Sequence, residues 1–124
     1  MTEEMRLVDH PMVDGFTEEN LKIYAGPDGA GGVPHLYQIR EAATDKVLCE
    51  IVLQHGHPKE VGVNGIGNQS LLLILQDFLR KANAGEFPCR ETSVGITKIE
   101  EALHWNKQRE LDRKKRGVLQ TYKK

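Results

Sequence analysis

The first half of the chain consists of short apolar runs that alternate with polar positions and are separated by turn residues. Residues 20–26 (NLKIYAG) and 34–40 (PHLYQIR) follow the two-residue period of β-strands. Residues 46–56 (KVLCEIVLQHG) are the strongest strand candidate because they are rich in β-branched and apolar side chains. Thr44 and Asp45 precede this run as turn residues, so the pattern predicts an antiparallel β-meander.

Three neighbouring segments complete the first half. Residues 1–20 show no sustained period and are expected to form a loose arm. Residues 26–32 (GPDGAGG) are rich in glycine and contain a proline, which marks a turn or loop. Residues 59–67 (KEVGVNGIG) are predicted to form a fourth extended piece that closes in an Asn-Gly turn, so the strand region covers residues 21–66.

The second half changes to a helical period. Residues 68–85 (NQSLLLILQDFLRKANAG) begin with a possible capping residue, Asn68 or Ser70, and end in glycine, as helices commonly do. After the break at residues 87–89 (FPC), a second helix is predicted to run from residue 90 to Gly117. The expected fold is therefore α+β, a single domain of residues 1–124 with a helical hairpin at 68–117 and a tail at 118–124.

The first predicted helix has more apolar surface than one neighbouring layer requires, because residues 71–75 (LLLIL) are apolar on all sides. One interpretation is a central helix packed between the sheet and the second helix. The other is a helix that also contacts another subunit, since small domains with surplus apolar surface commonly form symmetric oligomers. We therefore expect a homo-oligomer that assembles through the helices.

Three arginines follow each other on one face of the second predicted helix. Arg109, Arg113 and Arg116 are spaced by four and three residues, and an apolar stripe precedes them at Ile96, Ile99 and Leu103. A buried guanidinium without a partner would be very costly, so this end of the helix is expected to face solvent, a cleft or another subunit. Because the planar guanidinium forms paired contacts to phosphate, the face is a candidate anion site, although a solvated basic helix end explains it equally well.

The charge distribution supports an anionic ligand. The 124 residues carry a net charge of −1, but residues 1–67 hold 5 basic and 11 acidic side chains, whereas residues 68–124 hold 12 and 7. The positive field is therefore local. A small nucleic-acid-binding protein that uses the basic second helix is the alternative, although Glu110 and Asp112 interrupt the arginines and no base-reading helix is evident.

Other function classes find little support in the sequence. No membrane span or signal peptide is evident, and two cysteines are too few for a disulfide framework, so we expect a cytoplasmic protein. No nucleophile elbow or phosphate-binding loop with its lysine is present. The histidines and cysteines that could be zinc ligands match no common zinc pattern in their spacing: His35, Cys49, His55, His57, Cys89 and His104. We expect neither catalysis nor a metal or cofactor.

Residues 60–121 resemble the first type of phage Thoeris anti-defence sponge. The residues that carry the resemblance are VGVNG at 61–65, LLLILQDFL at 71–79, Gly85, Phe87, Cys89-Arg90-Glu91, ITKIEEALHW at 96–105, Arg113, Arg116-Gly117-Val118 and Thr121. The hairpin is also similar to the phage sponge that captures cyclic oligonucleotides of the CBASS defence system. The resemblance implies a non-enzymatic oligomer, a dimer or a multiple of dimers such as a hexamer. It would sequester a cyclic ADP-ribose isomer or a cyclic oligonucleotide in the host bacterial cytoplasm, without binding a membrane or a specific nucleic acid.

The resemblance also implies a ligand site shared between subunits. Arg109 and Arg113 would clamp a pyrophosphate, with Arg116 close by, and Phe87 or a neighbouring apolar group would support a base. The other positions expected to contact ligand are Asn64, Ala82, Arg90 and Thr92. Two of these depart from the family pattern, which commonly has an aromatic residue where this chain has Ala82 and an asparagine where it has Thr92. Alanine cannot stack on a base, and threonine lacks the paired donor and acceptor of an amide.

Overall fold

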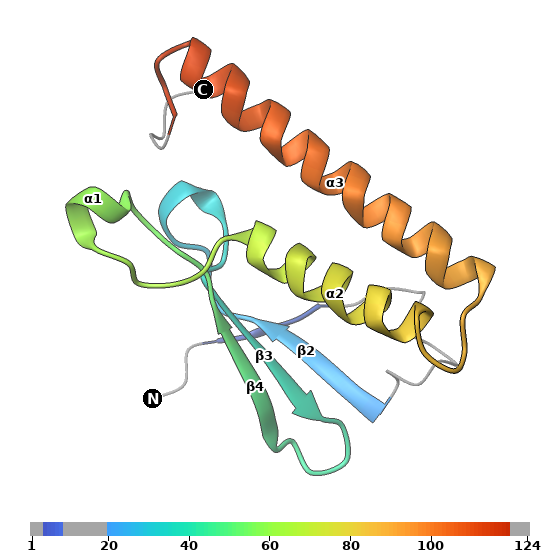
Figure 1. Cartoon of the computed structure of the whole chain (residues 1–124). Helices are drawn as coiled ribbons and strands as arrows, with labels where there is room; N and C mark the ends of the chain where they lie inside the picture. Colours follow the sequence, from blue (N-terminus) through green and yellow to red (C-terminus); the bar gives the residue numbers. More distant parts are fainter. Residues whose placement is uncertain (1–3, 9–19, 120–124) are drawn as a thin grey trace. The chain divides into compact units, whose positions relative to one another are not determined.

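The computed structural model of the chain describes residues 4–8 and 20–119 (Figure 1). It forms two compact units, a sheet unit (Met1–Ile66) and a helical unit (Gly67–Lys124). The main elements are β1 (Arg6–Val8), β2 (Leu21–Ala25), the 3-10 turn η2 (Ala30–Gly32), β3 (Leu36–Glu41), β4 (Val47–Val52), α1 (Pro58–Val61), α2 (Asn68–Asn83) and α3 (Arg90–Lys115). The α+β class is confirmed, whereas a single domain over residues 1–124 stays a prediction.

The sheet is an antiparallel meander in the order β1-β2-β3-β4. The three predicted strands are β2, β3 and β4, and the tight turn between β3 and β4 places Asp45 at a positive φ of 63°. The amide N–H of Asp45 donates to the carbonyl of Glu41 at 2.9 Å, which closes this hairpin. The sequence pattern missed β1, because three residues are too few to show a period. The rest of the predicted arm, 1–3 and 9–19, lies outside the described residues.

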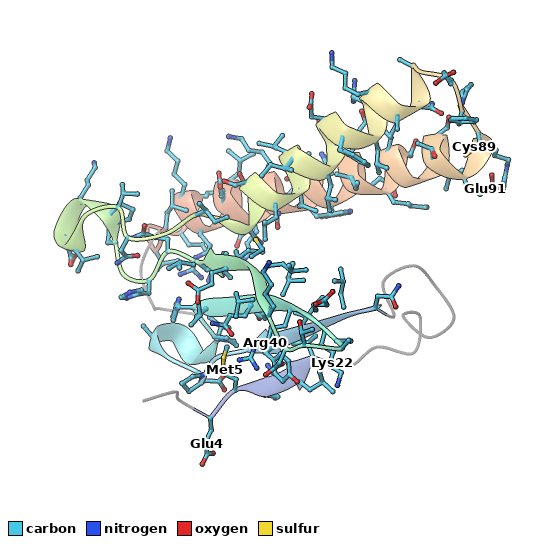
Figure 2. The ribbon with its side chains drawn as sticks, turned by 90° about the horizontal axis from the view of Figure 1, so that it is seen from below. Glu4, Met5, Lys22, Arg40, Cys89 and Glu91 are labelled. Carbon is cyan, nitrogen blue, oxygen red and sulfur yellow. The ribbon has the colours of Figure 1, made fainter. Side chains whose placement is uncertain are left out.

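Polar contacts of Arg40 tie the strands together on one face of the sheet. Its guanidinium donates twice to Oε1 of Gln38, at 2.8 and 3.0 Å, and forms an ion pair with Asp45 at 3.2 Å. It also lies 4.3 Å above the ring of Tyr24 on β2 and donates to the sulfur of Met5, which precedes β1 (Figure 2). Arg40 therefore links the edge of the meander to its far hairpin.

The predicted fourth extended piece at residues 59–67 is wrong for its first three residues. Its first residues belong to the short helix α1, and Ile66 pairs with Leu53 in an isolated parallel bridge. Pro58 stands at the first helical position, where its missing N–H costs nothing, and Nδ1 of His57 accepts the N–H of Lys59 at 3.0 Å. These local start signals outweigh the apolar alternation that suggested a strand.

The helical unit is an antiparallel pair, as predicted, in which α3 extends beyond the beginning of α2 (Figure 1). Polar side chains of the two helices pair with each other: Gln69 with Glu110 at 2.9 Å, Arg80 with Glu100, and Asn83 with Ser93 at 3.0 Å. The expected cap at Asn68 or Ser70 is wrong. Gly67 occupies the cap position, and α2 therefore begins without a hydrogen bond from a capping side chain. Among the described residues, no helix is long and apolar enough to cross a membrane.

Candidate ligand-binding residues on the helical hairpin

The predicted site residues of the helical unit fall into two groups. Phe87, Arg90, Thr92 and Ala82 surround the turn between α2 and α3, whereas Arg109, Arg113 and Arg116 lie at the other end of α3. The 19 residues from Arg90 to Arg109 correspond to about 28 Å along the helix axis, at about 1.5 Å per residue. One nucleotide-sized ligand therefore cannot contact both groups of the same chain.

The three arginines have different surroundings. Arg109 is exposed and forms no ion pair with any other described residue. Arg116 is exposed and its Nε donates to Asp112 at 3.0 Å. Arg113 has an exposed fraction of only 8%, and its Nη2 donates to the carbonyl of Val118 at 2.9 Å. The expectation that this end of the helix faces solvent, a cleft or another subunit therefore fits the exposed Arg109 and Arg116, whereas Arg113 is buried with a partner in its own chain.

Helical geometry explains this difference. At about 100° per residue, Arg113 lies about 40° around the helix from Ile99, whereas Arg109 lies about 80° away. Ile99 is partly buried, so Arg113 continues the packed side of α3 and Arg109 points outward.

The end of α3 is a Schellman motif that also involves Arg113. Gly117 has a φ of 74°, and its N–H donates to the carbonyl of Lys114 at 3.1 Å. The N–H of Val118 donates to the carbonyl of Arg113 at 2.9 Å. This pair of bonds requires the left-handed conformation that glycine tolerates best, which explains the order Arg116-Gly117-Val118. Since the Arg113 side chain also reaches Val118, this arginine fastens the segment that follows the helix.

The turn between the helices is held by Asn83. Its Oδ1 accepts the N–H of Cys89 at 3.1 Å, and its Nδ2 donates to Oγ of Ser93. Cys89 and Glu91 lie at this end of the hairpin (Figure 2), where Cys89 occupies the cap position of α3. The turn presents Phe87 with an exposed fraction of 83%. An anchored turn with a protruding aromatic ring is a suitable surface for a partner ring or an apolar side chain.

The remaining residues of the turn are also accessible. Ala82 and Arg90 are exposed, and Thr92 is partly exposed, with its Oγ1 3.1 Å from the sulfur of Cys89. Cys89 itself is also exposed. Arg90 forms no ion pair with another described residue.

Asn64, the predicted ligand residue of the sheet unit, holds a loop. Its Oδ1 accepts the N–H of His55 at 3.0 Å, and its Nδ2 donates to the carbonyl of the same residue at 2.8 Å. Oε1 of Gln54 accepts the backbone N–H groups of Asn64 and Gly65. The side-chain oxygen and nitrogen of Asn64 are thus both hydrogen-bonded within the protein. These contacts account for the asparagine at this position, so no ligand is needed to explain it.

No group of three or more potential metal ligands occurs in the described part of the chain. His35 and His55 lie with ring centroids 5.0 Å apart, and Nε2 of His35 bonds to the carbonyl of Ala30 at 2.8 Å. These contacts connect Ala30 in the glycine loop, through His35, with His55 in the segment after β4. The two histidines offer at most two ligands, fewer than a structural zinc site requires.

The sequence interpretation overlooked Trp105. This residue lies on α3 four positions before Arg109 and has an exposed fraction of 68%. Its side chain contacts His104, with ring centroids 5.4 Å apart and ring planes at 73°. The spacing of Trp105 and Arg109 is visible in the sequence, but an apolar residue on a long helix is ordinarily assigned to the core.

Comparison with known proteins identifies the hairpin. The family model described as "Acb2/Tad1, hairpin domain" matches residues 45–109, which run from Asp45, in the turn before β4, to Arg109. A protein named Thoeris anti-defense 1, from Bacillus phage SBSphiJ7, is 35% identical over 96 residues. The aligned region covers 77% of this chain and 66% of that protein, slightly less than two thirds of its length.

Proposed function

This chain belongs to the Acb2/Tad1 hairpin-domain family, and we propose that it is a phage anti-defence sponge that binds a cyclic nucleotide-type immune signal without cleaving it. The ligand would be a cyclic ADP-ribose isomer or a cyclic oligonucleotide, and its sequestration in the host cytoplasm would block Thoeris or CBASS immunity. The relative named Thoeris anti-defense 1 supports this proposal more strongly for Thoeris than for CBASS.

Arg109 is the structural observation that carries the proposal. It lies inside the matched hairpin, it is exposed, and no described carboxylate neutralises it. A guanidinium in this state can form paired hydrogen bonds to a phosphate, each worth about 1.5–3 kcal/mol because one partner is charged. A sponge needs only such binding contacts and no nucleophile or general base.

The two groups of predicted site residues fit a pocket between chains. The arginine end and the turn end of one hairpin are about 28 Å apart, so they meet only if different copies contribute them. Apolar side chains that could bring copies together are at least half exposed on α2: Leu73, Ile74, Leu75 and Phe78. We propose that Arg109, with Arg116 and Arg113 nearby, holds the phosphates, and that Phe87, Arg90, Thr92 and Ala82 border the same or a second pocket type.

A release experiment tests this function directly. The purified protein is incubated with cyclic ADP-ribose isomers and cyclic oligonucleotides, washed, denatured by heat, and the supernatant is analysed by mass spectrometry. Recovery of an unchanged ligand supports the sponge. A chemically converted ligand would instead identify an enzyme. If no cyclic nucleotide is retained while random duplex DNA binds, the protein is a nucleic-acid-binding protein and the proposal is wrong.

A further inference from the structure

Trp105 lies on the side of α3 that faces away from α2. Two contacts fix the side that faces α2: Glu100 bonds to Arg80 and Glu110 bonds to Gln69. At about 100° per residue, Trp105 lies about 140° around the helix from Glu100 in one direction and about 140° from Glu110 in the other. Trp105 is therefore on the side of α3 opposite to both glutamates. Within the helical unit the indole ring is therefore on the open face, in agreement with its exposed fraction of 68%.

A stripe of cations accompanies Trp105 on this open face. Lys98, Arg109 and Arg116 all lie within about 40° of Trp105 around the helix. Lys98 pairs with Glu101 at 3.5 Å and Arg116 pairs with Asp112 at 3.0 Å, whereas Arg109 has no ion pair with another described residue. The guanidinium that is available to an anion is thus the one that lies a single turn from the indole, about 6 Å along the axis.

The indole also contacts a neighbouring side chain on α3. The ring of His104 contacts it in an edge-to-face arrangement, with centroids 5.4 Å apart and planes at 73°. Such a contact limits rotation of the indole, so less conformational entropy is lost when a second ring stacks on it. An exposed and oriented aromatic ring beside one unneutralised guanidinium is the combination that recognises a nucleobase and its neighbouring phosphate.

We propose that Trp105 stacks on the base of a purine nucleotide whose phosphate is held by Arg109. This inference rests on the proposed function, because it concerns the site in which the signal is bound. A ribose separates base and phosphate by roughly the spacing that one helical turn provides. In this arrangement a single chain supplies both groups, whereas Phe87 would have to come from another copy.

The experiment uses the fact that the chain contains one tryptophan. Its fluorescence, excited at a wavelength that adenine does not absorb, reports on Trp105 alone. Cyclic ADP-ribose and cyclic diadenylate are titrated as adenine-containing probes, and inorganic pyrophosphate is titrated as a probe without a base. We expect the adenine probes to quench the emission and to protect the indole from acrylamide, and pyrophosphate to do neither.

Variants complete the test. Trp105→Ala should weaken the binding of an adenine probe, measured by calorimetry, by about 5- to 150-fold, the range for loss of one base-aromatic stack. Trp105→Phe should retain most of the affinity because a smaller ring still stacks. Leu111→Ala is the matched control, since it removes an exposed apolar side chain from another face of the same helix, and it should bind like the parent protein.

Two results would overturn this inference and leave the sponge intact. The first is calorimetric binding of an adenine probe with unchanged tryptophan emission and an equal affinity in Trp105→Ala. The second is a lower oligomeric mass of Trp105→Ala by light scattering together with lost binding, because the indole would then belong to an interface between copies. Retention of neither adenine probe by the parent protein would overturn this inference, whereas the proposed function would be overturned only if none of the cyclic nucleotides in the release experiment is retained.

Discussion

Arg109 and Arg113 stand one helical turn apart on α3 and carry the same side chain, yet their surroundings differ. Arg109 is exposed without an ion pair among the described residues, whereas Arg113 is 8% exposed and bonds to Val118. The sequence predicts their common spacing, because helical periodicity depends only on residue number. It cannot predict which guanidinium finds a partner, because Val118 becomes a neighbour only after Gly117 turns the chain back.

The first residue-scale prediction concerns Arg109. Arg109→Ala should lower the affinity for the retained cyclic nucleotide by about 1.5–3 kcal/mol, the value of hydrogen bonds to a charged group. Stability should change little because the side chain is exposed. Calorimetry measures the affinity and urea unfolding the stability, with the exposed Lys107→Ala as the control for loss of one positive charge. An unchanged affinity in Arg109→Ala would remove this residue from the site.

The second prediction concerns Arg113, for which we expect a substitution to lower the stability of the protein. Arg113→Ala leaves the Val118 carbonyl without its guanidinium donor and should lower the free energy of unfolding by about 1–3 kcal/mol. Urea unfolding followed by Trp105 emission reports this change, since the tryptophan belongs to the helical unit. Arg113→Lys should recover part of the loss. Equal stability of Arg113→Ala and the parent protein would show that the contact with Val118 contributes nothing.

At the scale of elements, the long periodic segments were predictable and the short ones were not. The meander β2-β3-β4 and the helices α2 and α3 follow from apolar periods and turn residues. β1 has three residues, and α1 depends on Pro58 and the His57 cap, so neither leaves a period to detect. The two groups of site residues follow from helix length alone, whereas the role of Asn64 requires contacts that only the folded loop provides.

Gly65 provides a prediction for the loop after α1. A Cβ at this position would lie 2.5 Å from the carbonyl carbon of Leu53 and 2.6 Å from the nitrogen of Gln54, so the loop could not stay against β4. Gly65→Ala should cost about 1–3 kcal/mol of stability, as overpacking does. Gly26→Ala is the control in the same unit, because its Cβ would meet Leu36 at 3.4 Å or more. Chemical unfolding, monitored by circular dichroism, should give a lower free energy of unfolding for Gly65→Ala than for Gly26→Ala. Equal values would contradict the close packing at Gly65.

Asn83 provides the corresponding prediction for the hairpin turn. Asn83→Ala removes the acceptor of the Cys89 N–H and the donor to Ser93, whereas Ser93→Ala removes only the second contact. At about 1 kcal/mol per hydrogen bond, the first variant should lose about 2 kcal/mol and the second about 1 kcal/mol. Urea unfolding measures both. A loss in Ser93→Ala as large as that in Asn83→Ala would show that the Cys89 contact does not hold the turn.

At the scale of the whole molecule, the exposed apolar side chains bear on whether copies of the chain associate, and the local positive charge bears on which anion is bound. In the described part of the chain, Ala25 is the one apolar side chain that is fully buried, and α2 exposes Leu73, Ile74, Leu75 and Phe78. Apolar area of this kind is ordinarily covered in solution. We predict a dimer or a multiple of dimers at micromolar concentration by light scattering. A monomeric mass would exclude pockets that are shared between copies.

Salt dependence separates a cyclic-nucleotide sponge from a nucleic-acid-binding protein. Binding to duplex DNA releases counterions, and the logarithm of affinity falls by about 0.9 per neutralised phosphate for each logarithmic unit of salt. A basic helix that contacts about five phosphates would thus lose several hundredfold in affinity between about 50 and 200 mM salt. A cyclic nucleotide has few phosphates and no condensed counterions, and contacts in an enclosed pocket are screened less.

We therefore expect the affinity for the retained cyclic nucleotide to fall by less than about tenfold over the same range, since its phosphates release few ions. Random duplex should bind weakly and dissociate near physiological salt, because Asp112 lies beside the exposed arginines of α3 and pairs with Arg116. Fluorescence anisotropy of labelled duplex and calorimetry of the cyclic nucleotide, at matched salt concentrations, measure the two slopes. Nanomolar binding of random DNA at physiological salt, with a melting temperature that no cyclic nucleotide shifts, would contradict the sponge and establish the basic helix as a nucleic-acid surface.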